Sequence, residues 1–266
     1  MAELDLHAHH ERAIAHATTL LRRDPEVRAL LLGGSIAHGF ESPASDVDLL
    51  IVVSDEDYDA RMREGRVQWA TAEACEWPGG YVEGKYLCPR FLAEVAHAGS
   101  EPARFAFQHA RVLFSDVGDL AETLRDVVRY PVEQKADRIR RFHAQFEAWH
   151  WYGHEALKRN DRYLLGLAVA RTVLFGGRMI LAHNERLHPY HKWFLTVLEQ
   201  APARPPDLME RIAALHDEPS QATLLGLWAA VKNFRSWEGA DQPWAVQFMR
   251  DSELNWLGGS TPIDDL

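Results

Sequence analysis

One stretch near the N-terminus constrains the fold more than any other part of this 266-residue chain. Residues 27–32 form a short, largely apolar run, as expected for a strand that is buried on both faces. Gly33 and Gly34 follow, and adjacent glycines allow a sharp turn and a close approach of a ligand to the backbone. A second apolar run covers residues 49–53. This order predicts two buried strands connected through a glycine turn.

Two carboxylates stand at the start of the second run. Asp46 and Asp48 are two positions apart, so on an extended strand both side chains point to the same face. Neighbouring carboxylates repel each other unless a cation lies between them, and a hard divalent cation is the usual solution. Ser35 adds a hydroxyl and amides that suit phosphate oxygens. The alternative is a plain turn with surface aspartates, but an unpaired charge at Asp48 beside an apolar run would be costly.

This pattern resembles the nucleotidyltransferase superfamily that includes DNA polymerase β and kanamycin nucleotidyltransferase. The residues that match the superfamily pattern are Gly34, Ser35, Gly39, Ser45, Asp46, Asp48 and Leu49. The resemblance is close over residues 30–53 and only architectural beyond them. It implies an α+β fold in which a small mixed-sheet catalytic domain is followed by an all-α helical bundle.

The resemblance also implies a third carboxylate on a strand beside the two aspartates. Residues 81–87 alternate in character and predict that strand, which carries Glu83. An ordinary ion pair with Lys85, two residues further on, is the alternative role for Glu83. The other candidates for the third carboxylate are Glu73 and Glu76.

In the resembling enzymes, two Mg²⁺ ions lie between such carboxylates and the triphosphate of ATP. Carried over to this chain, Asp46, Asp48 and Glu83 hold the metals. Glu83 also accepts the proton of an acceptor hydroxyl that attacks the α-phosphorus. The nucleotide-binding residues would be Gly34, Ser35 and Ser45. The resemblance thus implies a Mg²⁺-dependent enzyme that moves AMP from ATP onto a hydroxyl group of a small molecule.

Composition narrows the choice of acceptor. The chain carries 39 Asp and Glu against 29 Lys and Arg, a formal net charge of −10. Nucleic-acid binding relies on clustered basic residues, so a nucleic-acid substrate is not expected. An acidic protein suits a small cationic acceptor better. An aminoglycoside-like molecule fits best, which would make antibiotic resistance the biological role.

The chain shows no sign of export. Its first residues are acidic and lack the apolar core of a signal peptide, and no apolar run looks long enough to span a membrane. The two cysteines, Cys75 and Cys88, fit no metal motif and no disulfide scaffold. We therefore expect a cytoplasmic protein with no membrane partner. The oligomeric state stays open, a homodimer included.

The sequence changes character near Pro131. From there to about Trp237 no strand pattern is convincing, and several amphipathic helices are predicted. The helix expected over residues 161–184 is apolar almost all round, as in the centre of a bundle. We expect a catalytic domain over residues 1–130 and a helical domain over residues 131–266.

Lys192 is the cation of the helical half that we expect to bind the phosphates. It stands at a helix start where polar, cationic and aromatic side chains gather, and its ammonium suits a phosphate. A polar loop between helices is the alternative. Arg171 and Arg178 lie on the apolar helix and need a phosphate or a carboxylate, such as Glu155 or Glu185.

The histidines near the N-terminus could suggest a metal site, but we expect them to be solvated side chains on the polar face of a terminal helix: His7, His9, His10 and His16.

Two alternative functions remain. A protein adenylyltransferase of the antitoxin-like kind is a second function, although such proteins are often shorter and lack a large second domain. A non-catalytic nucleotide sensor is a third, although it would not need the whole Gly-Ser and Asp-x-Asp set.

Overall fold

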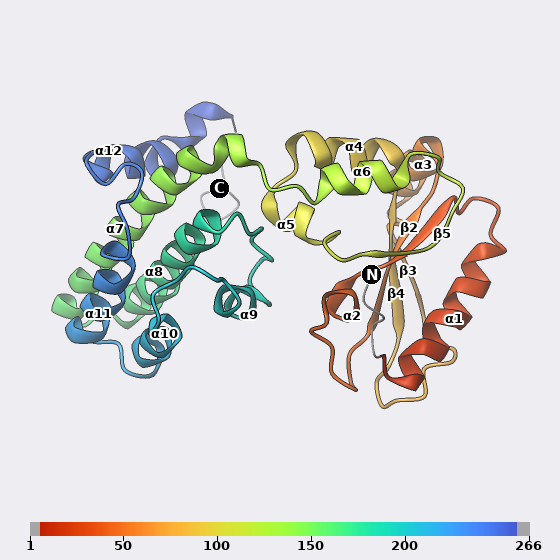
Figure 1. The fold of residues 1–266 in the computed structure, drawn as a ribbon, viewed down its shortest axis with the longest axis horizontal. Helices are drawn as coiled ribbons and strands as arrows, with labels where there is room; N and C mark the ends of the chain where they lie inside the picture. The colour runs from red at the N-terminus through yellow and green to blue at the C-terminus, as the bar shows by residue number, and fades with distance from the viewer. Residues whose placement is uncertain (1–5, 260–266) are drawn as a thin grey trace. The chain divides into compact units, whose positions relative to one another are not determined.

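The structure is a computed structural model that describes residues 6–259 (Figure 1). The chain divides into two compact units, Met1–Arg129 and Tyr130–Leu266. The sequence analysis places the division one residue later, after Tyr130.

The first unit is built on a mixed sheet of five strands in the order β3-β4-β2-β1-β5. Strands β2 and β4 run parallel, and the other neighbours are antiparallel. The strands are β1 (Ala29–Leu32), β2 (Val47–Val52), β3 (Gln68–Thr71), β4 (Val82–Leu87) and β5 (Arg111–Ser115). Together with the helical second unit, this sheet confirms the predicted α+β fold class.

Helices cover the sheet (Figure 1), and each of its faces has its own apolar core. Leu30 and Leu49 pack with α1 on one face. Leu31 and Val52 pack with α4 and α6 on the other. Because both faces are covered, the central strands read as apolar runs in the sequence. The helices of this unit are α1 (Ala8–Arg22), α2 (Gly34–His38), α3 (Asp55–Glu64), α4 (Pro89–Ala98), α5 (Glu101–Phe105) and α6 (Leu120–Val127).

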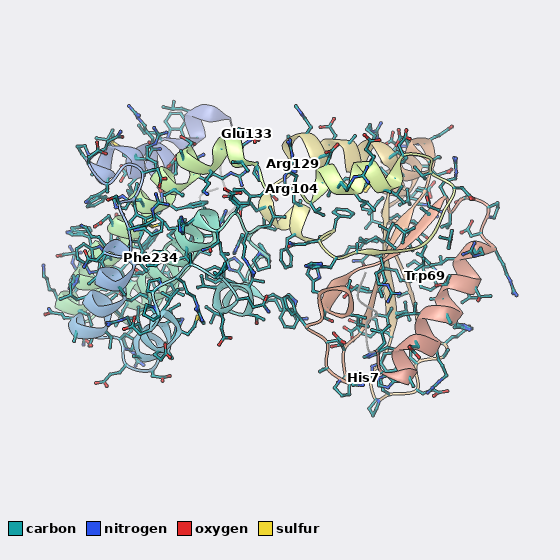
Figure 2. All side chains as sticks on the ribbon, viewed as in Figure 1. His7, Trp69, Arg104, Arg129, Glu133 and Phe234 are labelled. Atoms are coloured by element: carbon teal, nitrogen blue, oxygen red, sulfur yellow. The ribbon has the colours of Figure 1, made fainter. Side chains whose placement is uncertain are left out.

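A buried arginine joins the helices of the second face. Figure 2 labels Arg104 of α5 and Arg129 at the end of this unit. Arg104 donates to the carbonyl oxygens of Ala96 at 2.9 Å, Val127 at 3.1 Å and Arg129 at 3.4 Å. These bonds satisfy carbonyls at the C-terminal ends of α4 and α6, which have no partner within their own helices. One side chain thereby fixes three helices against the sheet.

The second unit contains only helices among its described residues. The antiparallel pair α7 and α8 forms its centre, and Gly176 and Gly177 of α8 let Phe146 and Phe194 pack closely against the helix backbone. The helices are α7 (Lys135–Arg159), α8 (Arg162–His183), α9 (Phe194–Glu199), α10 (Leu208–Asp217), α11 (Gln221–Lys232) and α12 (Trp244–Phe248). Short turns of helix complete it: η1 (Val132–Gln134), η2 (Met249–Glu253) and η3 (Asn255–Gly258).

The expectation that no apolar run is long enough to span a membrane was wrong. Helix α8 has 22 residues and a mean hydropathy of 1.6 in its most apolar window, enough to cross a membrane by length and composition. Half of that window is buried inside the unit. The central helix of a bundle passes the same test, so α8 is weak evidence for a membrane span.

Candidate active site

The sheet places two carboxylates side by side. In the parallel pairing of β2 with β4, Asp48 is the register partner of Glu83. Leu50 and Val52 continue the same face of β2, since side chains on a strand alternate, and pack into the core beneath α4 and α6. Asp48 therefore occupies the first position of a face that becomes apolar along β2, whereas on β4 the exposed Lys85 follows Glu83 on that face. The strand predicted to carry Glu83 is present and lies beside β2.

The two carboxylates are poorly compensated. Burial, followed by the charge of Glu83 and a hydrogen bond with its side chain, raises the pKa of Asp48 to about 6. Lys85 opposes this shift, and the charge of Asp46 adds to it. The folded protein thus keeps a proton on Asp48 well above the usual range of an aspartate. A bound cation would relieve the same repulsion.

Asp46 lies just before β2 and is held by a tyrosine. The hydroxyl of Tyr81 is hydrogen-bonded to Asp46, and this bond, with the charge of Asp46, raises the pKa of Tyr81 to about 12. The backbone of Val47 also donates to the carbonyl of Tyr81 at 3.2 Å. Within residues 6–259, no group of three or more His, Cys, Asp or Glu side chains is close enough to hold a metal ion. The structure therefore shows a pair, Asp48 with Glu83, and Asp46 beside it rather than a closed triad.

The glycine turn lies directly against Asp48. The N–H group of Gly33 donates to the carbonyl of Asp48 at 2.9 Å, which joins the turn to β2. Gly34 has φ +62°, and a Cβ atom at this position would collide with the Asp48 carboxylate. Ser35 follows as a buried residue, 8% exposed, in the short helix α2. Position 34 thus favours glycine for two reasons: its φ angle is positive, and the Asp48 carboxylate occupies the space that a Cβ atom would need.

Replacing Gly34 tests this second requirement. Gly39 has a similar φ of +70°, yet a Cβ there would meet nothing within 4 Å, so Gly39→Ala is a matched control for backbone strain alone. We expect Gly39→Ala to cost about 1–2 kcal/mol of stability. Gly34→Ala should cost clearly more, because Asp48 must move. Calorimetric unfolding of both variants measures the difference, and equal losses of stability would contradict the close contact.

His38, which no sequence pattern indicated as a site residue, contacts the backbone of the glycine turn. His38 Nδ1 lies 2.7 Å from the carbonyl oxygen of Gly34, and its Nε2 lies 3.2 Å from that of Phe105. The His38 ring also stacks on the Phe105 ring, with centroids 4.4 Å apart. Burial lowers the pKa of His38 despite these two carbonyls. His38 therefore joins the glycine turn to α5, and its spacing four residues after Gly34 on a helix is the only local signal.

The N-terminal histidines hold the loop that precedes β2. His10 is 0% exposed, so the expectation of solvated histidines was wrong for this residue. Its Nε2 lies 3.0 Å from the carbonyl oxygen of Ser45, and His9 Nε2 lies 2.9 Å from that of Pro43. Both rings pack against Trp77. Burial, followed by the charge of His9, lowers the pKa of His10. These contacts give α1 a positioning role for the carboxylate loop.

The two alternative acids lie elsewhere. Glu73 contacts His16 Nε2 at 3.3 Å, and Glu76 forms an ion pair with Arg12, both on α1. Of the three acids considered from the sequence, Glu83 is the one that the sheet brings to the aspartates.

The remaining predicted nucleotide ligands have structural contacts of their own. The hydroxyl of Ser45 accepts the N–H group of Ser42 at 2.9 Å inside its own turn. Lys192 belongs to the second unit, where it is exposed and its ammonium lies 5.2 Å from the ring centroid of Trp193. A nucleotide-binding role for Ser45 and Lys192 stays a prediction.

Comparison with known families agrees with this geometry. Residues 15–92 match the family model of the nucleotidyltransferase domain, a range that contains the glycine turn, Asp46, Asp48 and Glu83. Residues 100–194 match a second family model, a domain of unknown function named DUF4037. This second match begins in the first unit and ends in the second.

No curated protein matches this chain. Among solved structures, a nucleotidyltransferase-like protein from Exiguobacterium sibiricum 255-15 is similar, with a TM-score of 0.47 and 10% sequence identity. The similarity covers 97% of this chain and 83% of that chain. At this level of likeness no functional inference follows from it. The family match over residues 15–92, on a unit with this sheet and carboxylate pair, shows that the chain carries a nucleotidyltransferase domain of the polymerase-β-like superfamily.

Proposed function

We propose that this protein transfers AMP from ATP to a hydroxyl group of a small molecule. The observation that carries the proposal is the Asp48–Glu83 pair on adjacent parallel strands, directly beneath the glycine turn at Gly34. A nucleotidyltransferase domain over residues 15–92 supplies the general reaction, nucleotidyl transfer.

The donor atoms suit a hard divalent cation. Asp46, Asp48 and Glu83 offer only carboxylate oxygens, which Mg²⁺ prefers. The pKa of Asp48 is raised first by burial and then by the charge of Glu83, and a bound cation would offset both effects. We propose these three residues as the metal ligands. Two Mg²⁺ ions bound there would neutralise charge on the triphosphate and on the leaving pyrophosphate.

The residues of this chain then have distinct roles. Gly34 lets the triphosphate approach the backbone, where the amides of Gly34 and Ser35 and the hydroxyl of Ser35 bind phosphate oxygens, with Ser45 as a further ligand. Glu83 takes the proton of the acceptor hydroxyl as its oxygen forms a bond to the α-phosphorus. The bond between that phosphorus and the bridging oxygen of the β-phosphate breaks, and pyrophosphate leaves. Positioning and charge stabilisation supply most of the rate.

The charge of the chain supports a cationic acceptor. A net charge of −10 attracts cations to the surface and repels polyanions. An aminoglycoside-like molecule meets both requirements, because its amines carry positive charge and its hydroxyls can accept the AMP group. Such a reaction would modify an antibiotic in the cytoplasm.

Mass spectrometry tests the proposal directly. The purified protein is incubated with ATP and Mg²⁺ against a panel of aminoglycosides and lincosamides, and separately with cell extract. We expect a small molecule that gains one adenylyl group, and no product in EDTA. An adenylylated protein in the extract would instead identify a protein adenylyltransferase. ATP binding with no adduct of either kind would identify a nucleotide sensor.

A further inference from the structure

A line of ionisable side chains runs along one face of α7. His143, Glu147, His150 and His154 follow at steps of four, three and four residues, the spacing that keeps side chains on one side of a helix. Helix α11 packs against this part of α7, and its Trp228 contacts both Glu147 and His150. All of these residues lie outside residues 15–92, the nucleotidyltransferase domain, so the proposed nucleotidyl transfer does not account for them.

The last two residues of this line, His150 and His154, lie with their ring nitrogens close together. The two Nε2 atoms are 3.1 Å apart. Bonds of about 2.0–2.1 Å from both atoms to a shared metal ion would meet at about 100°, between the ideal angles of octahedral and tetrahedral coordination. The ring centroids are 4.6 Å apart with the ring planes at 86°, so at least one ring is tilted off the line between the nitrogens. Such a tilt weakens a direct N–H···N hydrogen bond, whereas the spacing suits a bidentate metal site.

Packing against α11 fixes the orientation of the His150 ring. This ring stacks on the ring of Trp228, with centroids 4.8 Å apart and 13° between the planes. Trp228 is held in turn by Glu147, whose Oε2 accepts the indole N–H at 3.1 Å. Lys232 of α11 pairs with the other carboxylate oxygen, Oε1, at 3.2 Å. One of the two nitrogen donors is therefore in place before an ion arrives, which reduces the entropic cost of binding.

The charge state of His150 also suits a metal ion. Burial, followed by the charge of His154, lowers the pKa of His150 to about 4, and Glu147 opposes this shift while Lys232 adds to it. The ring is therefore neutral at neutral pH, which is the form that binds metal, and no proton has to be displaced from it. Both His150 and His154 are partly exposed, so an ion and its water ligands can reach them.

We propose that His150 and His154 form a bidentate site for a divalent transition-metal ion such as Zn²⁺ or Ni²⁺, with water in the remaining positions. Imidazole nitrogens favour these ions, whereas Mg²⁺ prefers oxygen ligands. A site of two side chains agrees with the finding that residues 6–259 contain no group of three or more potential ligands. The site goes beyond the proposed nucleotidyl transfer, because it uses neither Mg²⁺ nor the carboxylates of the sheet.

Calorimetric titration with Ni²⁺ tests the site in the full chain, with an excess of Mg²⁺ present to occupy oxygen ligands. We expect saturable Ni²⁺ binding and a higher unfolding midpoint when Ni²⁺ is present, because the ion binds only the folded helix. A histidine pair that is merely hydrogen-bonded would not shift the midpoint. No saturable binding of Ni²⁺ up to about 1 mM would overturn the proposal.

Variants locate the binding. His150→Gln and His154→Gln should each weaken Ni²⁺ binding at least about tenfold, because loss of a ligand costs no less than loss of a residue that only orients one. His216→Gln is the matched control, since His216 is an exposed histidine on α10 of the same unit, and it should change the affinity less than about twofold. Asp48→Asn should leave Ni²⁺ binding unchanged, which separates this site from the carboxylates of the sheet.

The two histidine variants do not carry the same risk to the fold. His150 packs on Trp228, so unfolding midpoints in EDTA are needed to confirm that His150→Gln is folded, and His154→Gln provides the second measurement. Unchanged Ni²⁺ affinity in His154→Gln would refute the assignment. Equal weakening by His216→Gln, or loss of Ni²⁺ binding in Asp48→Asn, would place the ion elsewhere and refute it as well.

Discussion

Glu83→Gln is expected to lower the turnover of nucleotidyl transfer by about 10²–10⁴-fold, the usual effect of losing a general base. Glutamine keeps the size of the side chain but cannot accept the proton of the acceptor hydroxyl. ATP affinity should fall much less, because Asp46 and Asp48, the other two proposed metal ligands, remain. Single-turnover kinetics separate the two quantities, since they measure ATP binding and the chemical step independently.

Two matched substitutions show whether the effect is specific to Glu83. Glu73→Gln and Glu76→Gln remove carboxylates that contact His16 and Arg12 on the exposed side of α1. Exposed ion pairs contribute little, so both variants should retain near wild-type turnover. An inactive Glu73→Gln or Glu76→Gln variant beside an active Glu83→Gln variant would mean that the base has been misassigned.

The sequence predicted β1 and β2 as apolar runs, because α1 covers one face of the sheet while α4 and α6 cover the other. It predicted β4 from alternating character, since only part of that strand is buried. β3 was missed because Gln68–Thr71 is a short edge strand of partly exposed side chains with no apolar run. Strand signals in a sequence come from burial, so an exposed edge leaves little trace.

The parts of the site that depend on residues close together in the sequence were predictable. The spacing of Gly34 and Asp48 follows from the single connection between two adjacent strands, β1 and β2. The pairing of Asp48 with Glu83 depends instead on the register of β2 with β4. The long-range contacts of the supporting histidines were not predictable. His10 contacts a carbonyl 35 residues away along the chain and His38 one that is 67 residues away, and no local sequence pattern indicates either contact. The spacing of His38 from Gly34 indicates only its contact with the glycine turn. Positioning residues of this kind become visible only once the chain is folded.

Asp48→Asn should abolish transfer and metal-dependent ATP binding, yet make the metal-free protein more stable at neutral pH. Burial and Glu83 raise the pKa of Asp48 from 3.8 to about 6, so the folded state binds this proton more tightly than the unfolded chain does. Ionising Asp48 in the folded protein therefore lowers the free energy of unfolding. This loss of stability is small below the unfolded pKa of 3.8, grows as the pH rises, and is complete above the folded pKa of about 6. Asparagine carries no charge and should avoid a cost of about 3 kcal/mol at about pH 7.5.

Calorimetric unfolding in EDTA at about pH 4 and about pH 7.5 measures this gain, which should be small at the lower pH and full at the higher one. Adding Mg²⁺ with ATP should then reverse the order of stability. Ligands that bind only the folded state stabilise the wild-type protein by mass action, and a variant without the metal site cannot gain in the same way. A stability advantage for Asp48→Asn that persists in Mg²⁺ and ATP would mean that Asp48 is a buried structural carboxylate rather than a metal ligand. Near wild-type turnover in that variant would refute the proposed reaction site itself.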